Sequence, residues 1–205
     1  MSRLRLLAAT AAASLGLLAL AAPASAGVRP HVPPVLALGS TGGPAVAVGD
    51  TVTAPLKTGT TLTVGSVTCT AGGFTATDLT NPTAPGTAQL GVSAMPIAAC
   101  GTGTSVSVVN LPLNLVVTSP TKAVLAATGT PFHLTVTQSS PLGSVTCVYA
   151  AGGGGLQGSV ANPDNSMHFS NTLAKFSGSA ACPVSAAMTM TYAPMNVGGT
   201  AVFVN

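Results

Sequence analysis

The residues best suited to catalysis lie in one polar stretch, NPDNSMHFSN, at positions 162–171. It contains an acid, Asp164, an imidazole, His168, and two hydroxyls, Ser166 and Ser170. A serine-type hydrolase needs a hydroxyl that a histidine activates and a carboxylate that orients the imidazole. The composition of this stretch therefore predicts Asp164, Ser166, His168 and Ser170 as candidate catalytic residues.

The same stretch also has a purely structural interpretation. Asn162-Pro163 is typical of a turn in which Asp and Asn side chains bond to backbone groups, and a strand would follow with Met167 and Phe169 facing inward. The chain has no G-x-S-x-G motif, which exposes the nucleophile in many hydrolases. As a calcium loop the stretch supplies only one carboxylate, which is too few. Both interpretations stay open, and the structural one is favoured.

The rest of the chain offers few groups for acid–base chemistry. His31 lies in the proline-rich segment RPHVPP and His133 on the outward face of an expected strand, and neither has a partner in sequence. The three acidic residues are all aspartates. We therefore expect a protein that is not an enzyme and that has no cofactor.

The charge of the chain disfavours nucleic acid as a partner. The formal net charge is +3, of which two units come from Arg3 and Arg5 near the N-terminus. The remaining basic residues are isolated from one another, whereas nucleic-acid binding needs clustered Lys and Arg.

The elements that must position these residues are expected to be β-strands. Valine and threonine alternate with small residues, and Gly, Pro and Asn separate the runs. In FHLTVTQ, for example, Phe132, Leu134 and Val136 share one face. The composition thus predicts an all-β fold.

The motif GSVTC occurs twice, at residues 65–69 and 143–147, and it belongs to a longer internal repeat. A shift of 78 positions aligns the two copies, and after a short insertion Asn81-Pro82 matches Asn162-Pro163. Ordered matches of this kind indicate a duplication. We interpret GSVTC as a central core strand that carries one inward cysteine in each copy.

The four cysteines are predicted to form two disulfide bonds. They lack the C-x-x-C spacing of a metal site, so no metal is expected. Three pairings exist for four cysteines, and the duplication selects Cys69–Cys100 and Cys147–Cys182, because each bond then repeats within one copy. We expect Cα separations of about 4.4–6.8 Å.

These observations give the expected organisation. Residues 1–26 read as a signal peptide, with basic Arg3 and Arg5, an apolar run and a small-residue cleavage site after Ala26. A Pro/Gly-rich segment at 27–44 precedes two repeat units, 45–122 and 123–205. We expect two tandem antiparallel β-sandwiches of about 78–82 residues, which resemble immunoglobulin-like domains in outline only.

The sequence predicts where the protein acts better than what it does. We expect a secreted extracellular protein that is not integral to the membrane after cleavage and acts as a binding, surface-associated or structural module, with a cell-wall or protein partner. The alternatives are a small-ligand-binding protein or protease inhibitor, with 152–155 and the Cys182-Pro183 segment as presenting loops, and a hydrolase using His168. Six of the seven aromatic residues lie in the second unit, which is therefore expected to hold a better-packed core or an apolar pocket.

Overall fold

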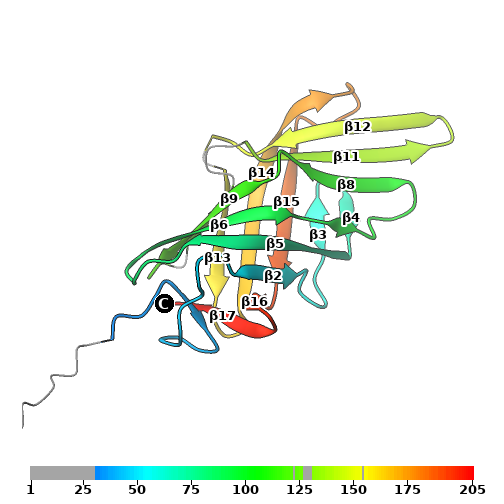
Figure 1. The fold of residues 1–205 in the computed structure, drawn as a ribbon. Helices are drawn as coiled ribbons and strands as arrows, with labels where there is room; N and C mark the ends of the chain where they lie inside the picture. The colour runs from blue at the N-terminus through cyan, green and yellow to red at the C-terminus, as the bar shows by residue number, and fades with distance from the viewer. Residues whose placement is uncertain (1–30, 122, 127–130, 154) are drawn as a thin grey trace, which may run out of the picture. The chain divides into compact units, whose positions relative to one another are not determined.

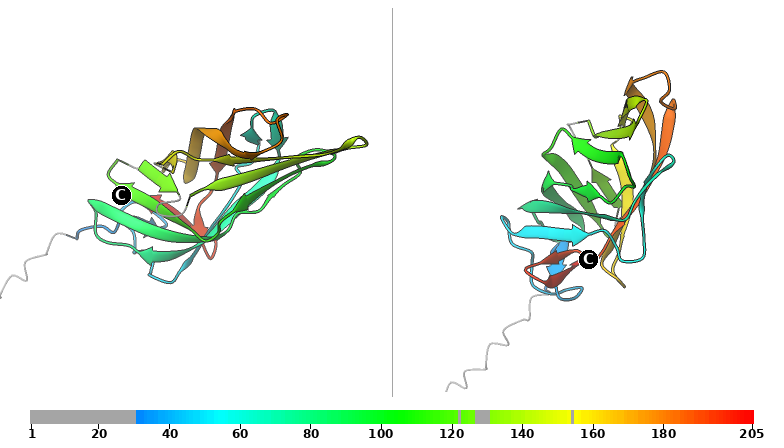
Figure 2. Two further views of the ribbon diagram at one scale, coloured as in Figure 1. Left: turned by 90° about the horizontal axis from the view of Figure 1, so that it is seen from above. Right: turned by 90° about the vertical axis from the view of Figure 1, so that its right-hand side faces the viewer.

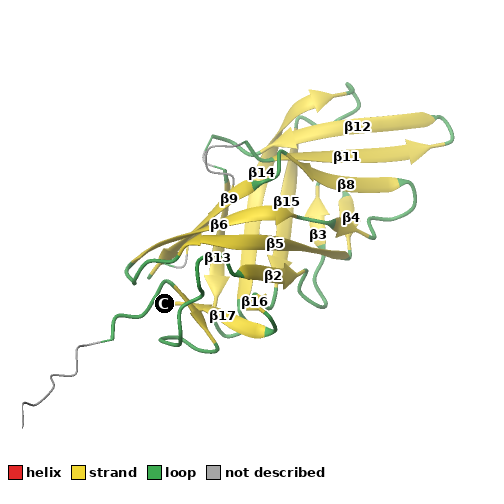
Figure 3. Ribbon diagram, viewed as in Figure 1, coloured by secondary structure: helices red, strands yellow, loops and turns green. Residues whose placement is uncertain are grey.

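The computed structural model describes residues 31–121, 123–126, 131–153 and 155–205, and within these ranges the chain forms strands and turns (Figure 3). The predicted signal peptide, residues 1–26, lies outside the described residues. Residues Val32–Asn205 form one unit. Across the described ranges, no helix is long and apolar enough to cross a membrane.

The strands follow one another as short antiparallel segments along the chain (Figure 1). Their bounds are β1 Leu36–Leu38, β2 Thr51–Pro55, β3 Leu62–Val64, β4 Val67–Cys69, β5 Ala71–Thr80, β6 Gly86–Ala94, β7 Ile97–Ala98, β8 Thr104–Val109, β9 Leu113–Ser119, β10 Ala123–Ala126, β11 His133–Ser140, β12 Gly143–Ala150, β13 Leu156–Ala161, β14 Ser166–Gly178, β15 Ser185–Tyr192, β16 Asn196–Val197 and β17 Thr200–Val204.

Most of the strands form two antiparallel sheets that share β14 and β15 (Figure 2). Of the others, β1, β17 and β16 pair in succession next to β2, and β7 pairs with β5. One sheet is curved and open, like half of a cylinder, with the strand order β4-β3-β15-β14-β12-β11-β8. The long strand β14 joins the sheets because its first residues pair with β13 and its last residues pair with β12.

The other sheet is a nearly closed cylinder of eight strands, in the order β2-β5-β6-β9-β10-β13-β14-β15. A single bridge between Leu56 and Tyr192 connects its first and last strands. Two backbone hydrogen bonds flank that bridge, from Lys57 N to Thr191 O at 2.8 Å and from Ala193 N to Pro55 O at 3.0 Å. The ends of β2 and β15 are thus held together, although the two strands are not paired along most of their length.

The apolar faces predicted from alternation are buried. Phe132, directly before β11, and Leu134 and Val136 on β11 are all buried in the core, as expected from their period of two. Residues from both halves of the sequence share this core, since the rings of Phe74 and Tyr192 pack edge to face with centroids 5.2 Å apart.

Strand partners cross the boundary between the predicted repeat units. Strand β8 pairs with β11, β9 with β10, and β3 with β15, so the two segments 45–122 and 123–205 share sheets instead of each closing its own. Alternation of apolar residues fixes which face of a strand is buried but does not specify its neighbours. The expected all-β class is therefore observed, with an arrangement that the sequence pattern did not predict.

Two asparagines occupy matching places in this arrangement. Asn81 and Asn162 each begin the turn of a hairpin, β5–β6 and β13–β14. Asn81 exchanges two hydrogen bonds with the backbone of Leu36, both 2.8 Å, and Asn162 does the same with Val204, at 2.9 and 3.0 Å. Leu36 and Val204 lie opposite each other in the β1–β17 ladder.

The cysteines form one disulfide in each half of the described chain, Cys69–Cys100 and Cys147–Cys182. Their Cα atoms are 3.9 and 5.7 Å apart, so the first separation is shorter than expected. Strand β12 is central, as predicted, because β11 and β14 flank it. The prediction for β4 is wrong: among the described residues, this three-residue strand pairs only with β3 and ends the open sheet. Directly after Cys69 the chain continues into β5, which pairs with β2, β6 and β7 instead.

Candidate functional site

The four residues predicted as a catalytic group are close in sequence but do not form a catalytic chain of hydrogen bonds. His168 is exposed on β14, and its Nδ1 lies 2.9 Å from Thr191 Oγ1 on the neighbouring strand. Ser166 is buried, whereas Ser170 is exposed two residues after His168, on the same face of β14. Among the described residues, the imidazole is hydrogen-bonded to neither serine and to no carboxylate.

Asp164 is engaged elsewhere. Its Oδ2 accepts a hydrogen bond from Lys57 Nζ at 2.7 Å, and its Oδ1 accepts one from the backbone N–H of Ser166 at 3.3 Å. The Lys57 hydrogen bond is the main reason that the pKa of Asp164 is lowered to about 2. This carboxylate therefore closes the turn before β14 and does not orient His168.

The other histidines are also without a catalytic arrangement in the described part of the chain. His133 lies on β11, where its Nδ1 is 3.2 Å from Asn110 Nδ2 and its ring is 4.3 Å from that of Phe176. His31 is exposed. No group of three or more His, Cys, Asp or Glu residues within the described ranges is close enough to hold a metal ion.

In the part of the chain that the structure describes, a cavity of about 150 Å³ in the open sheet is a candidate for binding. It lies between the β3–β4 turn and the β11–β12 hairpin, with the segment before β15 beside them. Both copies of GSVTC contribute to it. The lining residues are Val64, Gly65, Ser66, Val67, Val136, Gln138, Val145, Cys147, Tyr149, Ala181, Pro183 and Ala186.

The first wall is a tight turn held against the sheet. Gly65 has φ of 59°, a conformation that favours glycine, and its N–H donates to Ala187 O at 2.8 Å. A Cβ at position 65 would lie 3.7 Å from that of Ala186, in the lining of the cavity. A side chain here would therefore narrow the space between the turn and β15.

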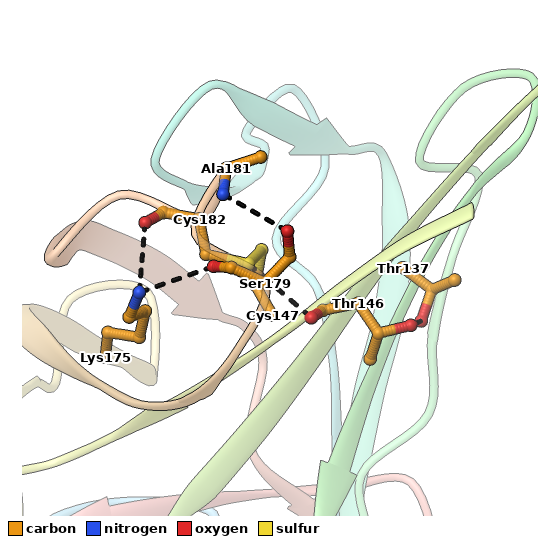
Figure 4. Close-up of a disulfide and its surroundings, with 7 residues drawn as sticks. All are labelled: Thr137, Thr146, Cys147, Lys175, Ser179, Ala181 and Cys182. Carbon is orange, nitrogen blue, oxygen red and sulfur yellow. Dashed lines mark hydrogen bonds between the residues drawn. A yellow bond between two sulfur atoms is a disulfide. The ribbon is translucent and has the colours of Figure 1, made fainter. Parts of the chain in front are cut away.

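The segment before β15 is fixed by covalent and polar contacts (Figure 4). The Cys147–Cys182 disulfide ties it to β12. Lys175 Nζ donates to the carbonyl oxygens of Ser179 and Cys182 at 3.4 and 3.5 Å, and Ala181 N donates to Ser179 Oγ at 3.2 Å. Ala181 and Pro183 are thus presented to the cavity by a braced turn.

The cavity lining carries no charged side chain. Its polar side chains are those of Ser66, Gln138 and Tyr149, and the other lining side chains are aliphatic or, at Cys147, sulfur. Tyr149 is only 4% exposed, and this burial raises the pKa of its phenol. Neutral walls of this kind suit the binding of an apolar molecule and offer no acid–base pair.

Sequence reasoning identified most of the lining strands but not the cavity. The GSVTC motifs, the inward Val145, Cys147 and Tyr149, and the Cys182-Pro183 segment were all evident from the pattern. The missing information was that β3–β4 would lie opposite β11–β12, which depends on pairing across the whole chain.

Comparisons with protein-family models, curated proteins and solved structures found no match.

Proposed function

We propose that this protein is an exported, non-catalytic binding protein that holds a small apolar ligand in the open sheet. The single observation that carries the proposal is the uncharged cavity of about 150 Å³ between the two GSVTC hairpins. A cavity of this size accommodates a molecule about as large as benzene. Burial of the ligand's apolar surface would provide the affinity.

The alternatives receive less support. A hydrolase using His168 would need the imidazole to contact a serine hydroxyl and a carboxylate, whereas its hydrogen bond goes to Thr191. A protease inhibitor would need an extended presenting loop, whereas residues 180 and 181 lie in a tight turn with Cys182 N bonded to Ser179 O at 3.0 Å. A partner protein or cell-wall surface remains the natural binding alternative, because Val184 and Leu142 are exposed apolar side chains.

The proposal includes export and duplication. Two disulfides fit an oxidising compartment, which is the environment that a signal peptide at 1–26 would provide. Asn81 is hydrogen-bonded to the backbone of Leu36 on β1, and Asn162 is hydrogen-bonded in the same way to Val204 on β17. These matching contacts support an origin by duplication, because Leu36 and Val204 are paired in one ladder. In this view, two sandwich-like units of common origin exchanged strands and left a cavity where their hairpins meet.

An NMR titration with toluene tests the proposed function. We expect toluene to shift the backbone signals of the lining residues and to raise the melting temperature, as binding to the folded state alone requires. Ala181→Trp should fill the cavity and abolish both effects. Ala180→Trp is the matched control, because Ala180 is an exposed neighbour in the same turn that does not line the cavity.

Two results would contradict the proposal. The first is a wild-type protein whose lining residues do not respond to toluene at concentrations up to its solubility. The second is an equal response in the Ala181→Trp and Ala180→Trp variants, which would place the binding elsewhere.

A further inference from the structure

We infer that the ligand is an uncharged molecule with one hydrogen-bond acceptor, which the hydroxyl of Tyr149 receives inside the cavity. This inference rests on the proposed function and names the chemical class of its ligand: a small ketone or alcohol with an apolar body. The observation behind it is a buried phenol that lines the cavity and lacks a hydrogen-bond partner among the described residues.

Tyr149 is held in a fixed place. It lies in the middle of the open sheet on β12, opposite Leu134 on β11 and Lys175 on β14. The other tyrosine, Tyr192, provides a contrast, because its hydroxyl donates to Met190 Sδ at 3.3 Å and it does not line the cavity. Of the two tyrosines in the chain, Tyr149 alone thus offers its hydroxyl to a ligand.

The Tyr149 hydroxyl retains access to open space. In the described part of the chain, the fully buried side-chain oxygens without a partner belong to Asp78 and Asn114, and the Tyr149 hydroxyl is not among them. Since the residue as a whole is 96% buried and it lines the cavity, we place its hydroxyl on the cavity side. A ligand acceptor in the cavity would give this hydroxyl a hydrogen bond that no described residue supplies.

The surroundings determine the charge of the ligand. No lining residue is charged, so an ionic ligand would lose its hydration without gaining a counter-charge. The nearby Lys175 is already bonded to two carbonyl oxygens of the turn, as Figure 4 shows. Burial also raises the pKa of Tyr149, which keeps the phenol a neutral hydrogen-bond donor.

Two probes of nearly equal shape separate the hydrogen bond from apolar burial. Cyclohexanone carries a carbonyl where methylenecyclohexane carries a C=CH₂ group, and both are close to benzene in size. Dissociation constants for both probes are measured by NMR titration on wild type, Tyr149→Phe and the control Tyr192→Phe. For each probe, the dissociation constant of the variant is compared with that of wild type. The hydration of the probe is the same in both measurements and therefore cancels.

We expect Tyr149→Phe to weaken cyclohexanone binding about fivefold, the effect of one ordinary hydrogen bond, and to change methylenecyclohexane binding less than twofold. Tyr192→Phe should leave both dissociation constants unchanged. A second readout uses wild type alone, with ¹³C at the tyrosine Cζ position. Cyclohexanone should shift the Cζ signal of Tyr149 more than methylenecyclohexane does, and it should not shift that of Tyr192.

The possible results distinguish the inference from the proposed function. If neither probe nor toluene binds wild type, the proposed function fails and the inference fails with it. If both probes bind but Tyr149→Phe affects them equally, or Cζ responds equally to both, the cavity is a binding site and the inference about its ligand is overturned. A variant that does not fold leaves the wild-type Cζ experiment to decide.

Discussion

The two GSVTC hairpins share five identical residues, but they differ in length and in their place in the sheet. In β3–β4, three-residue strands enclose a turn that is bonded to β15, and Cys69 lies opposite Leu62 at the end of the open sheet. In β11–β12, eight-residue strands extend the hairpin, and Cys147 lies opposite Val136 in the sheet interior. Leu142 at the tip of the second hairpin is fully exposed.

This difference shows which structural features the five residues of GSVTC specify and which they do not. In the first hairpin Gly65 and Ser66 form the turn itself, whereas in the second the motif follows the turn at residues 141 and 142. In both hairpins the motif directs the cysteine inward, as the alternation requires. The register and the neighbouring strands differ, because these depend on strand length and on the rest of the sheet. The two hairpins consequently form facing walls of one cavity instead of two equivalent cores.

The largest expected effects come from removing the disulfides one at a time. Cys69→Ala/Cys100→Ala and Cys147→Ala/Cys182→Ala should each lower the free energy of unfolding by about 3.5–4 kcal/mol, because the separations of 31 and 35 residues constrain the unfolded chain similarly. Urea denaturation measures both values.

Ligand binding should separate the two disulfide variants. The Cys147–Cys182 bond fixes the turn that carries Ala181 and Pro183, so its loss should abolish toluene binding at a temperature where the variant is still folded. The Cys69–Cys100 variant should still bind, because Cys69 and Cys100 do not line the cavity. Loss of binding in both, or in neither, would contradict the idea that the second bond serves the site.

The next largest effect concerns Asp78, which contrasts with Asp164 in the other half of the chain. Asp78 is 1% exposed on β5, and neither of its carboxylate oxygens has a hydrogen-bond partner of good geometry among the described residues. Burial, with a smaller contribution from the Asp50 carboxylate, raises the pKa of Asp78 to about 6, although the backbone N–H of Thr80 offsets part of this. Asp164, in its exposed ion pair with Lys57, shifts in the opposite direction.

The sign of the Asp78 effect on stability follows from its raised pKa. Between pH 4 and 6 the folded state binds more protons than the unfolded state, so the free energy of unfolding should fall as pH rises and stay lower above pH 6. The expected loss between pH 4 and 7 is about 2.5 kcal/mol. Asp78→Asn should remove this slope in urea denaturation at several pH values. A slope unchanged by the substitution would show that another group causes it.

The sequence predicted the local features of this molecule better than its long-range ones. The alternation of Phe132, Leu134 and Val136 was sufficient to assign their buried face, and the spacing of the cysteines gave the two pairs that the structure joins. The shared sheets could not be predicted, since partners such as β3 and β15 are more than 100 residues apart and their contact has no local signal.

The candidate site shows the same limit in another way. His168, Asp164 and the two serines were evident because catalytic residue types stand out by their chemistry. The cavity is made mainly of Val, Ala, Pro and Gly, which are also the ordinary residues of the core. A site of this composition is recognisable only after the strands that surround it have been placed.

The smallest expected effects on stability come from replacing the first residue of each GSVTC motif, a glycine, with alanine. Gly65 has φ of 59°, which alanine adopts at a cost of about 1 kcal/mol, whereas Gly143 has φ of 130°, a region that is nearly exclusive to glycine. Gly143→Ala should therefore lower the free energy of unfolding by about 2 kcal/mol and Gly65→Ala by about 1 kcal/mol. No neighbouring atom lies within 4 Å of a Cβ at position 143, so its cost is conformational.

Ligand affinity should rank the same two variants in the reverse order. A Cβ at position 65 would lie 3.7 Å from Ala186 Cβ in the cavity lining, so Gly65→Ala should weaken toluene binding severalfold. Gly143 does not line the cavity, and Gly143→Ala should bind toluene as wild type does while it remains folded. Stability and binding measured on both variants would thus separate the two hairpins at identical motif positions. If stability and affinity instead fell together in the same variant, the motif glycines would serve one common purpose, and the assignment of different roles to the two hairpins would be wrong.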